Sequence, residues 1–320
     1  MHMRVLVTGA TGFVGRHLCR LLCQRGYSVV GIAYSDDVNQ DAAVEQWYSA
    51  DIRDAGLVAS ILRFVRPDAI VHLAGASSVG ASFASPHETW LTNVIGTLNV
   101  VDAARTQAPD ARLLAITSAE QYAGINPSDL PITTACELAP LSPYGASKAA
   151  AYILAGQFRE NYGMDIIRVA PLNHIGPGQA DRFVIPKIAR QIAKAEADKQ
   201  NVVSINLGDI DIRRDFTDVR DIVRGYADLL IGKRQETDFL ICSGRSISLR
   251  EIIRRLSGTT DLDVNITQSQ ELMRPNEASD IYGSFAAIRK EVGWKPEIDL
   301  MRTLIDTVDY WRTETLTKDV

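Results

Sequence analysis

Short apolar runs alternate along the first half of the chain with stretches in which apolar residues recur every three or four positions. A short apolar run bounded by turn residues is typical of a buried strand, and the longer spacing is typical of a helix that buries one face. The apolar runs predict strands over 3–8, 28–32, 69–73, 112–117 and 165–170, with a further short strand just before Asp51. The spaced stretches predict helices from Val14 onward and over 54–65, 86–108 and 144–162. This alternation predicts an α/β fold with a Rossmann-type, doubly wound parallel sheet.

The pattern changes after Pro171, where turn residues replace the regular alternation. A helix over 218–231 and a strand over 238–241 are expected to return to the sheet. Further helices, expected in a smaller and mostly C-terminal lobe, are predicted over 183–197, 248–256, 285–292 and 300–311. We therefore predict two domains, with residues 1–172 plus 214–245 in the first and residues 173–213 plus 246–320 in the second.

Composition narrows the classes of partner. The chain has 320 residues, 46% of them hydrophobic, which is enough for a substantial core. With 34 basic and 39 acidic side chains the net charge is −5, which offers no general basic surface for nucleic acid. The apolar runs are all too short to span a bilayer, so a soluble, cytoplasmic protein without a membrane partner is expected. The cysteines lack metal-binding or redox spacing, and we expect core residues and no metal site at Cys19, Cys23, Cys136 and Cys242.

Glycines at the first strand-to-helix junction indicate a dinucleotide site. Gly9, Gly12 and Gly15 would let the turn close tightly and let the backbone approach a pyrophosphate at the helix N-terminus. The other residues of this turn that we expect to contact the cofactor are Thr11, Phe13, Val14 and Arg16. A nicotinamide cofactor, NAD(H) or NADP(H), is therefore predicted.

The end of the second strand bears on the choice between the two dinucleotides. Ala33 stands where an NAD-selective fold commonly places an acid for the ribose 2′-hydroxyl, which favours NADP(H) over NAD(H). Arg16 and Ser35 are then candidate contacts for a 2′-phosphate, although Arg16 could equally be a solvated helix residue. Asp36 and Asp37, slightly later, argue for the opposite choice.

Further cofactor contacts are expected where other strands end. Asp51 and Ile52 follow the third strand and would lie near the adenine, although Asp51 could instead cap the helix over 54–65. Small residues after a strand allow a ligand close to the backbone, and the remaining candidates of this kind are Leu73, Ala74, Gly75 and Pro171.

Two other polar residues are expected to have structural roles. His72 lies inside an apolar strand, where a hydrogen-bonded core histidine is a better interpretation than a catalytic one. Asn93 lies within the predicted helix over 86–108, where its side chain would serve as a structural or water-positioning group.

Candidate catalytic residues follow the fifth strand. Tyr144 and Lys148 are four residues apart at the start of a predicted helix and so share one helical face. A fixed cation stabilises a phenolate, so we expect Lys148 to draw the pKa of Tyr144 towards neutrality and prepare it for proton transfer to a carbonyl oxygen. Ser118 and Glu120 would reach the same carboxyl edge of the sheet.

Together, the glycine turn and Ser118, Tyr144 and Lys148 resemble the extended short-chain dehydrogenase/reductase family over essentially the whole chain. Within it the chain is most similar to the GDP-4-keto-6-deoxy-D-mannose reductases, through three segments: Asn173-His174-Ile175-Gly176-Pro177-Gly178-Gln179, Arg214-Asp215-Phe216-Thr217-Asp218-Val219-Arg220-Asp221 and Arg274-Pro275-Asn276-Glu277. The resemblance implies an NAD(P)-binding first domain and a nucleotide-sugar-binding second domain. It also implies NAD(P)H-dependent reduction of a C4 ketone, giving GDP-6-deoxy-D-mannose (GDP-D-rhamnose) in deoxysugar biosynthesis.

The same resemblance implies roles for single residues. Ser118 would bind the substrate oxygen, Tyr144 would act as general acid, and Lys148 would hold the nicotinamide ribose. The GDP-linked 4-keto-6-deoxy sugar would be bound by Ser118, Glu120, Asn173, Val184, Lys187, Arg214, Arg274 and Glu277. A homodimer formed through the helices over 86–108 and 144–162 is expected on the same ground.

Other functions are open at this stage. In the related GDP-mannose 4,6-dehydratases a glutamate at the position of Glu120 works as a base, so a dehydratase or epimerase is an alternative. Ala119 departs from the hydroxyl or acid usual there, so we interpret Glu120 as pocket lining. A 6-deoxy-talose-forming or heptose reductase is also possible, and a non-catalytic dinucleotide-binding regulator is a third class, against which the presence of Ser118, Tyr144 and Lys148 argues.

Overall fold

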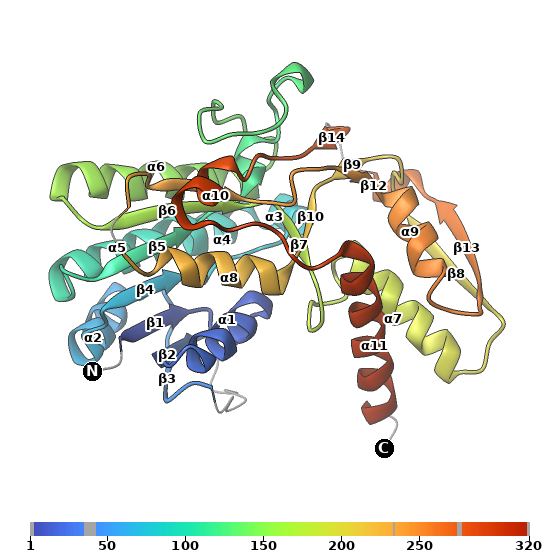
Figure 1. The fold of residues 1–320 in the computed structure, drawn as a ribbon, viewed down its shortest axis with the longest axis horizontal. Coiled ribbons are helices and arrows are strands. Elements are labelled where there is room, and N and C mark those ends of the chain that lie inside the picture. The colour runs from blue at the N-terminus through green and yellow to red at the C-terminus, as the bar shows by residue number, and fades with distance from the viewer. Residues whose placement is uncertain (1–2, 35–42, 233, 274–276, 319–320) are drawn as a thin grey trace.

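A computed structural model describes residues 3–34, 43–232, 234–273 and 277–318. Its centre is a seven-stranded sheet in which all neighbouring strands run parallel, which confirms the predicted fold class (Figure 1). The order is β11-β6-β5-β4-β1-β2-β3, so the direction of winding reverses at β1. Ligands of such sheets bind at the carboxyl ends of the strands beside this reversal. The strands are β1 (Arg4–Thr8), β2 (Ser28–Ala33), β3 (Gln46–Ser49), β4 (Ala69–His72), β5 (Arg112–Ile116), β6 (Ile166–Pro171) and β11 (Asp238–Ile241).

Helices cover both faces of this sheet. Leu18, Val71 and Tyr226 belong to the apolar cluster on one face, and Leu62 and Val100 belong to the cluster on the other. Because both faces are covered, the inner strands are almost continuously apolar, which is why the sequence pattern reveals them. The covering helices are α1 (Phe13–Gln24), α2 (Ala55–Val65), α5 (Gly96–Gln107), α6 (Pro143–Tyr162), α8 (Val219–Leu229) and α10 (Ala286–Val292).

The stretch predicted as one helix over 86–108 has three parts. A π-helical segment, Leu91–Ile95, joins α4 (Pro86–Trp90) to α5. Apolar residues still recur at helical intervals through this segment, so the sequence pattern does not reveal it. A π turn widens a helix locally and is frequent at functional sites, and Asn93, 1% exposed, lies in this one.

A third apolar cluster lies to one side of the sheet. It contains Ile192, Ile205 and Leu304, and Figure 1 shows two of its helices, α7 and α11, side by side. Its helices are α7 (Val184–Ala197), α9 (Leu249–Ser257) and α11 (Leu300–Lys318), the last longer than predicted. The sequence pattern did not predict the parallel pair formed by β8 (Val202–Leu207) and β13 (Asp263–Gln268). It also did not predict five strands of two or three residues: β7 (Asn173–Ile175), β9 (Arg213–Arg214), β10 (Phe216–Asp218), β12 (Ile247–Ser248) and β14 (Asp280–Ile281).

One late segment of the chain packs back against the large sheet. Trp294 is 1% exposed, belongs to the same cluster as Tyr226, and donates its indole N–H to the Asp221 carbonyl at 2.9 Å. The Asp221 carboxylate accepts the backbone N–H groups of Glu297 and Ile298. The predicted division into two domains stays a prediction, and Trp294 joins the sheet cluster although that prediction assigns it to the second domain.

The described residues contain no helix long and apolar enough to cross a membrane.

Candidate active site

Ser118 and Tyr144 meet at the carboxyl edge of the sheet. Ser118 follows β5, and its Oγ accepts a hydrogen bond from the Glu120 backbone N–H at 3.2 Å. Tyr144 is the second residue of α6, and the Ser118 side chain lies close enough to its phenol to lower the pKa of Tyr144 through hydrogen bonding, against the effect of burial. Two residues far apart in sequence are thus brought together, as the sequence indicates.

Lys148 lies one turn further along α6, at the end of β5. Its ammonium group donates to the Ile116 carbonyl at 3.1 Å, and only 9% of the residue is exposed. Burial penalises the charged ammonium and lowers the pKa of Lys148 to about 8. The site therefore holds a cation that is close to losing its proton at mildly alkaline pH.

The expected pKa of Tyr144 is wrong for this structure. Burial raises the pKa of Tyr144 to about 12, although the hydrogen bond with Ser118 opposes the rise, while the charge of Glu120 adds to it. The physical reason is that the phenol is almost fully enclosed, at 8% exposed, while the Lys148 ammonium is bonded to a main-chain carbonyl. At neutral pH Tyr144 is a protonated phenol.

The start of α6 is fixed by hydrogen bonds that place Tyr144. Ser142 caps the helix, because its Oγ accepts the Gly145 N–H at 3.0 Å, and Pro143 suits the first helical position. The Tyr144 N–H donates to Ser82 Oγ at 3.1 Å. Ser82 belongs to α3 (Val79–Ala84), a short helix that the sequence analysis missed, although Ser78 before it is a helix-capping residue.

The glycine turn has the shape that a dinucleotide site requires. Gly9 has a φ of +68°, and a Cβ atom added there would lie 2.9 Å from the Ala74 backbone nitrogen. The Gly12 N–H donates to the Gly9 carbonyl at 3.0 Å, and α1 begins at the next residue. The turn therefore touches the segment after β4, which brings together the predicted cofactor residues Gly9, Thr11, Gly12, Phe13, Val14, Gly15, Leu73, Ala74 and Gly75.

Of the residues expected to determine the preference between NADP and NAD, Arg16 lies within the described residues. Arg16 is exposed on α1. Burial raises the pKa of Tyr310 on α11 and the charge of Arg16 opposes the rise, which places Arg16 near that helix. Ser35, Asp36 and Asp37 lie outside the described residues. The preference for NADP(H) remains a prediction.

Asp51 and Ile52 follow β3, as predicted, and the structure decides whether Asp51 caps the next helix. Asp51 does not cap α2, because the capping residue is Asp54, whose carboxylate accepts the Leu57 N–H at 2.9 Å. The Asp51 carboxylate instead accepts the Arg53 backbone N–H and guanidinium, and this hydrogen bond with Arg53 lowers the pKa of Asp51. Ile52 is 5% exposed and packs in the apolar cluster beneath α2.

A pocket beside Tyr144 gathers three predicted substrate residues. Glu120, Arg214 and Glu277 line it together. The rest of its lining is largely apolar and was not predicted from the sequence: Val79, Phe83, Ala123, Leu141, Ser142, Ala278 and Ile281. No spacing pattern links these residues, so the sequence alone carries no signal for most of them.

Two of these residues contact each other in a way the resemblance does not imply. Arg214 donates to Glu277 Oε1 at 3.0 Å and to the Arg213 carbonyl at 2.8 Å. The resemblance implies only that both side chains bind the nucleotide sugar. They pair here because both are mostly buried and each opposite charge compensates the other.

The remaining predicted substrate residues lie on other elements. Asn173 is exposed at the start of β7, and Val184 and Lys187 lie half-buried in the first turn of α7. These three do not line the pocket that holds Arg214. Pro171 is buried at the end of β6, and Arg274 lies outside the described residues.

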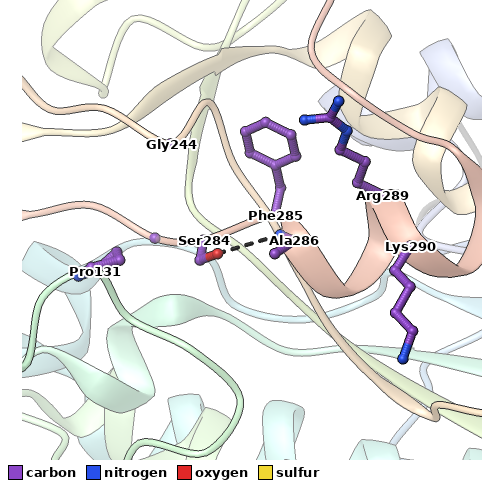
Figure 2. Close-up of a pocket in the computed structure, with 8 residues that line it drawn as sticks. Pro131, Gly244, Ser284, Phe285, Ala286, Arg289 and Lys290 are labelled. Carbon is purple, nitrogen blue, oxygen red and sulfur yellow. Dashed lines mark hydrogen bonds between the residues drawn. The ribbon is translucent and has the colours of Figure 1, made fainter.

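A second pocket, which shares no lining residue with the first, is shown in Figure 2. Phe285 faces it, and the side chains of Arg289 and Lys290 leave α10 in opposite directions. None of the predicted site residues lines it. Among the described residues, no group of three or more His, Cys, Asp or Glu side chains could hold a metal ion.

Comparison with known proteins agrees with this arrangement. Residues 6–307 match the sequence profile of the family described as GDP-mannose 4,6 dehydratase. The chain belongs to this family. It is a family of extended short-chain dehydrogenases/reductases, as the motifs predict.

Two relatives illustrate the range of activity in the family. The chain is 33% identical to GDP-6-deoxy-D-mannose reductase of Pseudomonas aeruginosa over 98% of both chains. It is 28% identical to GDP-mannose 4,6 dehydratase 2 of Caenorhabditis elegans over 92% of this chain and 85% of that one. The family assignment therefore covers both a dehydratase and a reductase.

Solved structures give the same fold. The structure of RMD from Pseudomonas aeruginosa complexed with NADPH has a TM-score of 0.84 at 32% identity, covering 98% of this chain and 99% of that one. A UDP-glucose 4-epimerase from Thermus thermophilus complexed with NAD has a TM-score of 0.85 at 25% identity, covering 97% and 99%. NADPH and NAD thus both occur among structures with this fold.

Proposed function

We propose that this protein reduces the C4 ketone of GDP-4-keto-6-deoxy-D-mannose to GDP-6-deoxy-D-mannose, using NADPH in preference to NADH. The observation that carries the proposal is the proximity of Ser118 and Tyr144, whose chain neighbours Glu120 and Ser142 line a pocket together with Arg214 and Glu277. This proximity supports a role for the protonated phenol as the proton donor to a sugar carbonyl bound in the pocket. The higher identity with a GDP-6-deoxy-D-mannose reductase than with the dehydratases supports the reductive reaction.

The chemistry follows from the protonation states. The reduced nicotinamide, when bound, supplies a hydride to C4 of the keto sugar. Tyr144 then donates its proton to the forming alkoxide, and the raised pKa keeps that proton available throughout the neutral range. Ser118 holds the substrate oxygen, and Lys148 provides positive charge beside the nicotinamide ribose.

We assign substrate binding to the residues that the family resemblance indicates. Arg214 would exchange Glu277 for the diphosphate, since a guanidinium fork matches phosphate oxygens, and Glu277 would accept the ribose hydroxyls. Asn173, Val184, Lys187 and Arg274 complete the proposed nucleotide-sugar contacts. The glycine turn, Asp51, Ile52, Leu73, Ala74, Gly75 and Pro171 form the proposed cofactor site.

A coupled assay tests the reaction. GDP-4-keto-6-deoxy-D-mannose is generated separately, the protein is added with NADPH or NADH, and nicotinamide oxidation is followed while NMR identifies the sugar. Oxidation in equal amount to a new GDP-6-deoxyhexose is expected, with the larger kcat/KM for NADPH. The NMR spectrum distinguishes the D-mannose from the 6-deoxy-talose configuration at C4, and a keto-heptose in parallel tests that substrate.

Replacing the general acid should abolish turnover. We expect Tyr144→Phe to lower kcat by at least ~100-fold, because the phenyl ring has no proton to give. The affinity for NADPH, measured by nicotinamide fluorescence, should stay within a few-fold of wild type. Tyr48→Phe is the matched control, since Tyr48 lies on β3 at the edge of the sheet that is farthest from β11. Turnover that survives in the Tyr144 variant would remove this residue from the mechanism.

Glu120 motivates one alternative function. It lines the substrate pocket and its charge acts on Tyr144, so it is within reach to serve as a base in a GDP-mannose 4,6-dehydratase reaction. Conversion of GDP-mannose to the keto sugar without net NADPH consumption would support this alternative. Loss of that conversion in Glu120→Gln would then assign the base.

We also propose a homodimer built on the two helical elements beside the site. The elements α4, α5 and α6 pack side by side. These elements expose large apolar side chains, which are between 41% and 59% exposed: Trp90 on α4, Ile95 on the π-helical segment, and Ile153 and Tyr162 on α6. A second copy that covered these large apolar side chains would remove them from water.

A further inference from the structure

A fully enclosed histidine lies between the cofactor turn and the catalytic helix. His72 ends β4, is 3% exposed, and its two ring nitrogens contact two different threonines. Nδ1 lies 2.8 Å from Thr8 Oγ1, at the end of β1, and Nε2 lies 3.0 Å from Thr97 Oγ1, on α5. The proposed mechanism does not use this residue.

The neighbouring bonds fix the direction of each hydrogen bond. Thr97 Oγ1 donates its only proton to the Asn93 carbonyl at 2.6 Å, so it must accept from the His72 Nε2–H. The imidazole is neutral, because burial and then the charge of Lys148 lower the pKa of His72 to about 3. Nδ1 is therefore an acceptor, and the Thr8 hydroxyl donates a hydrogen bond to it.

Each threonine leads to a different part of the site. On one side, Thr8 Oγ1 accepts the backbone N–H of Ala74 at 3.1 Å, in the segment that contacts Gly9. Thr8 thus holds the segment after β4 against the glycine turn. A displaced Thr8 would alter the surface predicted to receive the dinucleotide.

On the other side, Thr97 leads to the catalytic helix. The carbonyl that it binds belongs to Asn93, whose side chain accepts the Ala76 N–H at 2.8 Å and donates to Ser147 Oγ at 2.9 Å. Ser147 in turn donates to the Tyr144 carbonyl at 2.7 Å. This path of hydrogen bonds runs through the π-helical segment. Of the two roles expected for Asn93, structural or water-positioning, these bonds support the structural one.

We propose that His72 is a positioning residue with two separable tasks: its Nδ1 side holds the cofactor segment through Thr8, and its Nε2 side holds the catalytic helix through Thr97. The proposal rests on the proposed function for its catalytic arm, while its cofactor arm requires only dinucleotide binding. An apolar residue would satisfy the packing at this position, so the paired threonines are the reason for an imidazole.

Two substitutions separate the tasks. The amide oxygen of asparagine replaces Nδ1 as an acceptor, and the amide nitrogen of glutamine replaces Nε2 as a donor. We expect His72→Asn to lower kcat about tenfold while the NADPH dissociation constant is kept, because the Thr97 hydroxyl loses its donor. We expect His72→Gln to weaken NADPH binding about tenfold while kcat is kept better. Thr97→Val should lower kcat, as His72→Asn does. Thr8→Val should weaken NADPH binding, as His72→Gln does.

Controls separate positioning from loss of folding. Thr106→Val removes a hydroxyl bonded to the Asp102 carbonyl, the same kind of bond on the same helix, and should change neither quantity. Thr97→Ser restores the hydroxyl and should restore kcat, while the thermal unfolding midpoint of every variant reports folding. Equal losses of kcat and NADPH affinity in the two His72 variants would overturn the proposal. NADPH titration needs no turnover, so it tests the cofactor arm of the His72 proposal even if the protein does not catalyse the proposed reaction. An unchanged NADPH dissociation constant in Thr8→Val would overturn the proposal.

Discussion

At the scale of single residues, burial decides the protonation of the two ionisable groups on α6. It acts in opposite directions, raising the pKa of the Tyr144 phenol and lowering that of the Lys148 ammonium, because it disfavours the charged form of each. The Tyr144 phenol therefore keeps its proton at neutral pH and well into the alkaline range. The ammonium carries a cost in folding free energy, which the proposed catalytic role would explain.

The cost at Lys148 predicts a gain in stability when the charge is removed. The pKa falls from 10.5 to about 8 on folding, which corresponds to about 3 kcal/mol at neutral pH. Between these two values the unfolded chain binds more protons, so the free energy of unfolding rises with pH there. We expect Lys148→Met to raise the free energy of unfolding at pH 7 by about 1–3 kcal/mol and to abolish turnover.

Urea unfolding at two pH values checks this prediction. The gain should be full below pH 8 and should be almost gone at pH 10.5, where the folded-state ammonium is neutral and half of the unfolded chains have also lost that proton. Lys194→Met, at an exposed position on α7, is the control and should change stability little at either pH. A gain of the same size at both pH values would show that packing, rather than charge, is responsible.

At the scale of elements, the cap of α6 joins folding to activity. Ser142→Ala removes the acceptor of the Gly145 N–H, and we expect a loss of ~1 kcal/mol in unfolding free energy. Because Tyr144 lies in the same first turn, kcat should fall as well. Asp54→Ala removes a matching cap from α2 and should cost similar stability with kcat unchanged. Chemical unfolding and steady-state kinetics on both variants decide whether the cap of α6 matters for turnover.

Elements with strong periodicity are predictable from the sequence, and the contacts between distant segments are not. The strands of the large sheet are apolar on both sides, so β1, β4 and β5 stand out in the pattern. Strands of two or three residues, such as β9, are too short to carry a period. The pattern of strands and helices assigns Ser118, Tyr144 and Lys148 to one edge of the sheet, and their catalytic roles stay predictions. The Arg214–Glu277 pair and the His72 bridges join residues 25 to 64 positions apart, so local spacing holds no trace of them.

At the scale of the whole molecule, the proposed homodimer makes a direct prediction. We expect wild-type protein to have the mass of two chains in multi-angle light scattering, and Ile153→Glu on α6 to have the mass of one, because a buried unpaired carboxylate would disfavour the interface. Phe64→Glu, on α2 and 73% exposed, is the control and should leave the mass unchanged. A wild-type mass of one chain would refute the dimer.

The packing of Trp294 against the sheet cluster also bears on how the protein is made. A ribosome releases the chain starting from its N-terminus, and Trp294 emerges after every strand of the large sheet and after α8. Until it arrives, the side of α8 that carries Asp221 lacks its cover and apolar surface around Tyr226 stays accessible. Synthesis must therefore proceed past Trp294 before one face of the sheet closes, and until then the nascent chain presents a surface for chaperones or for aggregation.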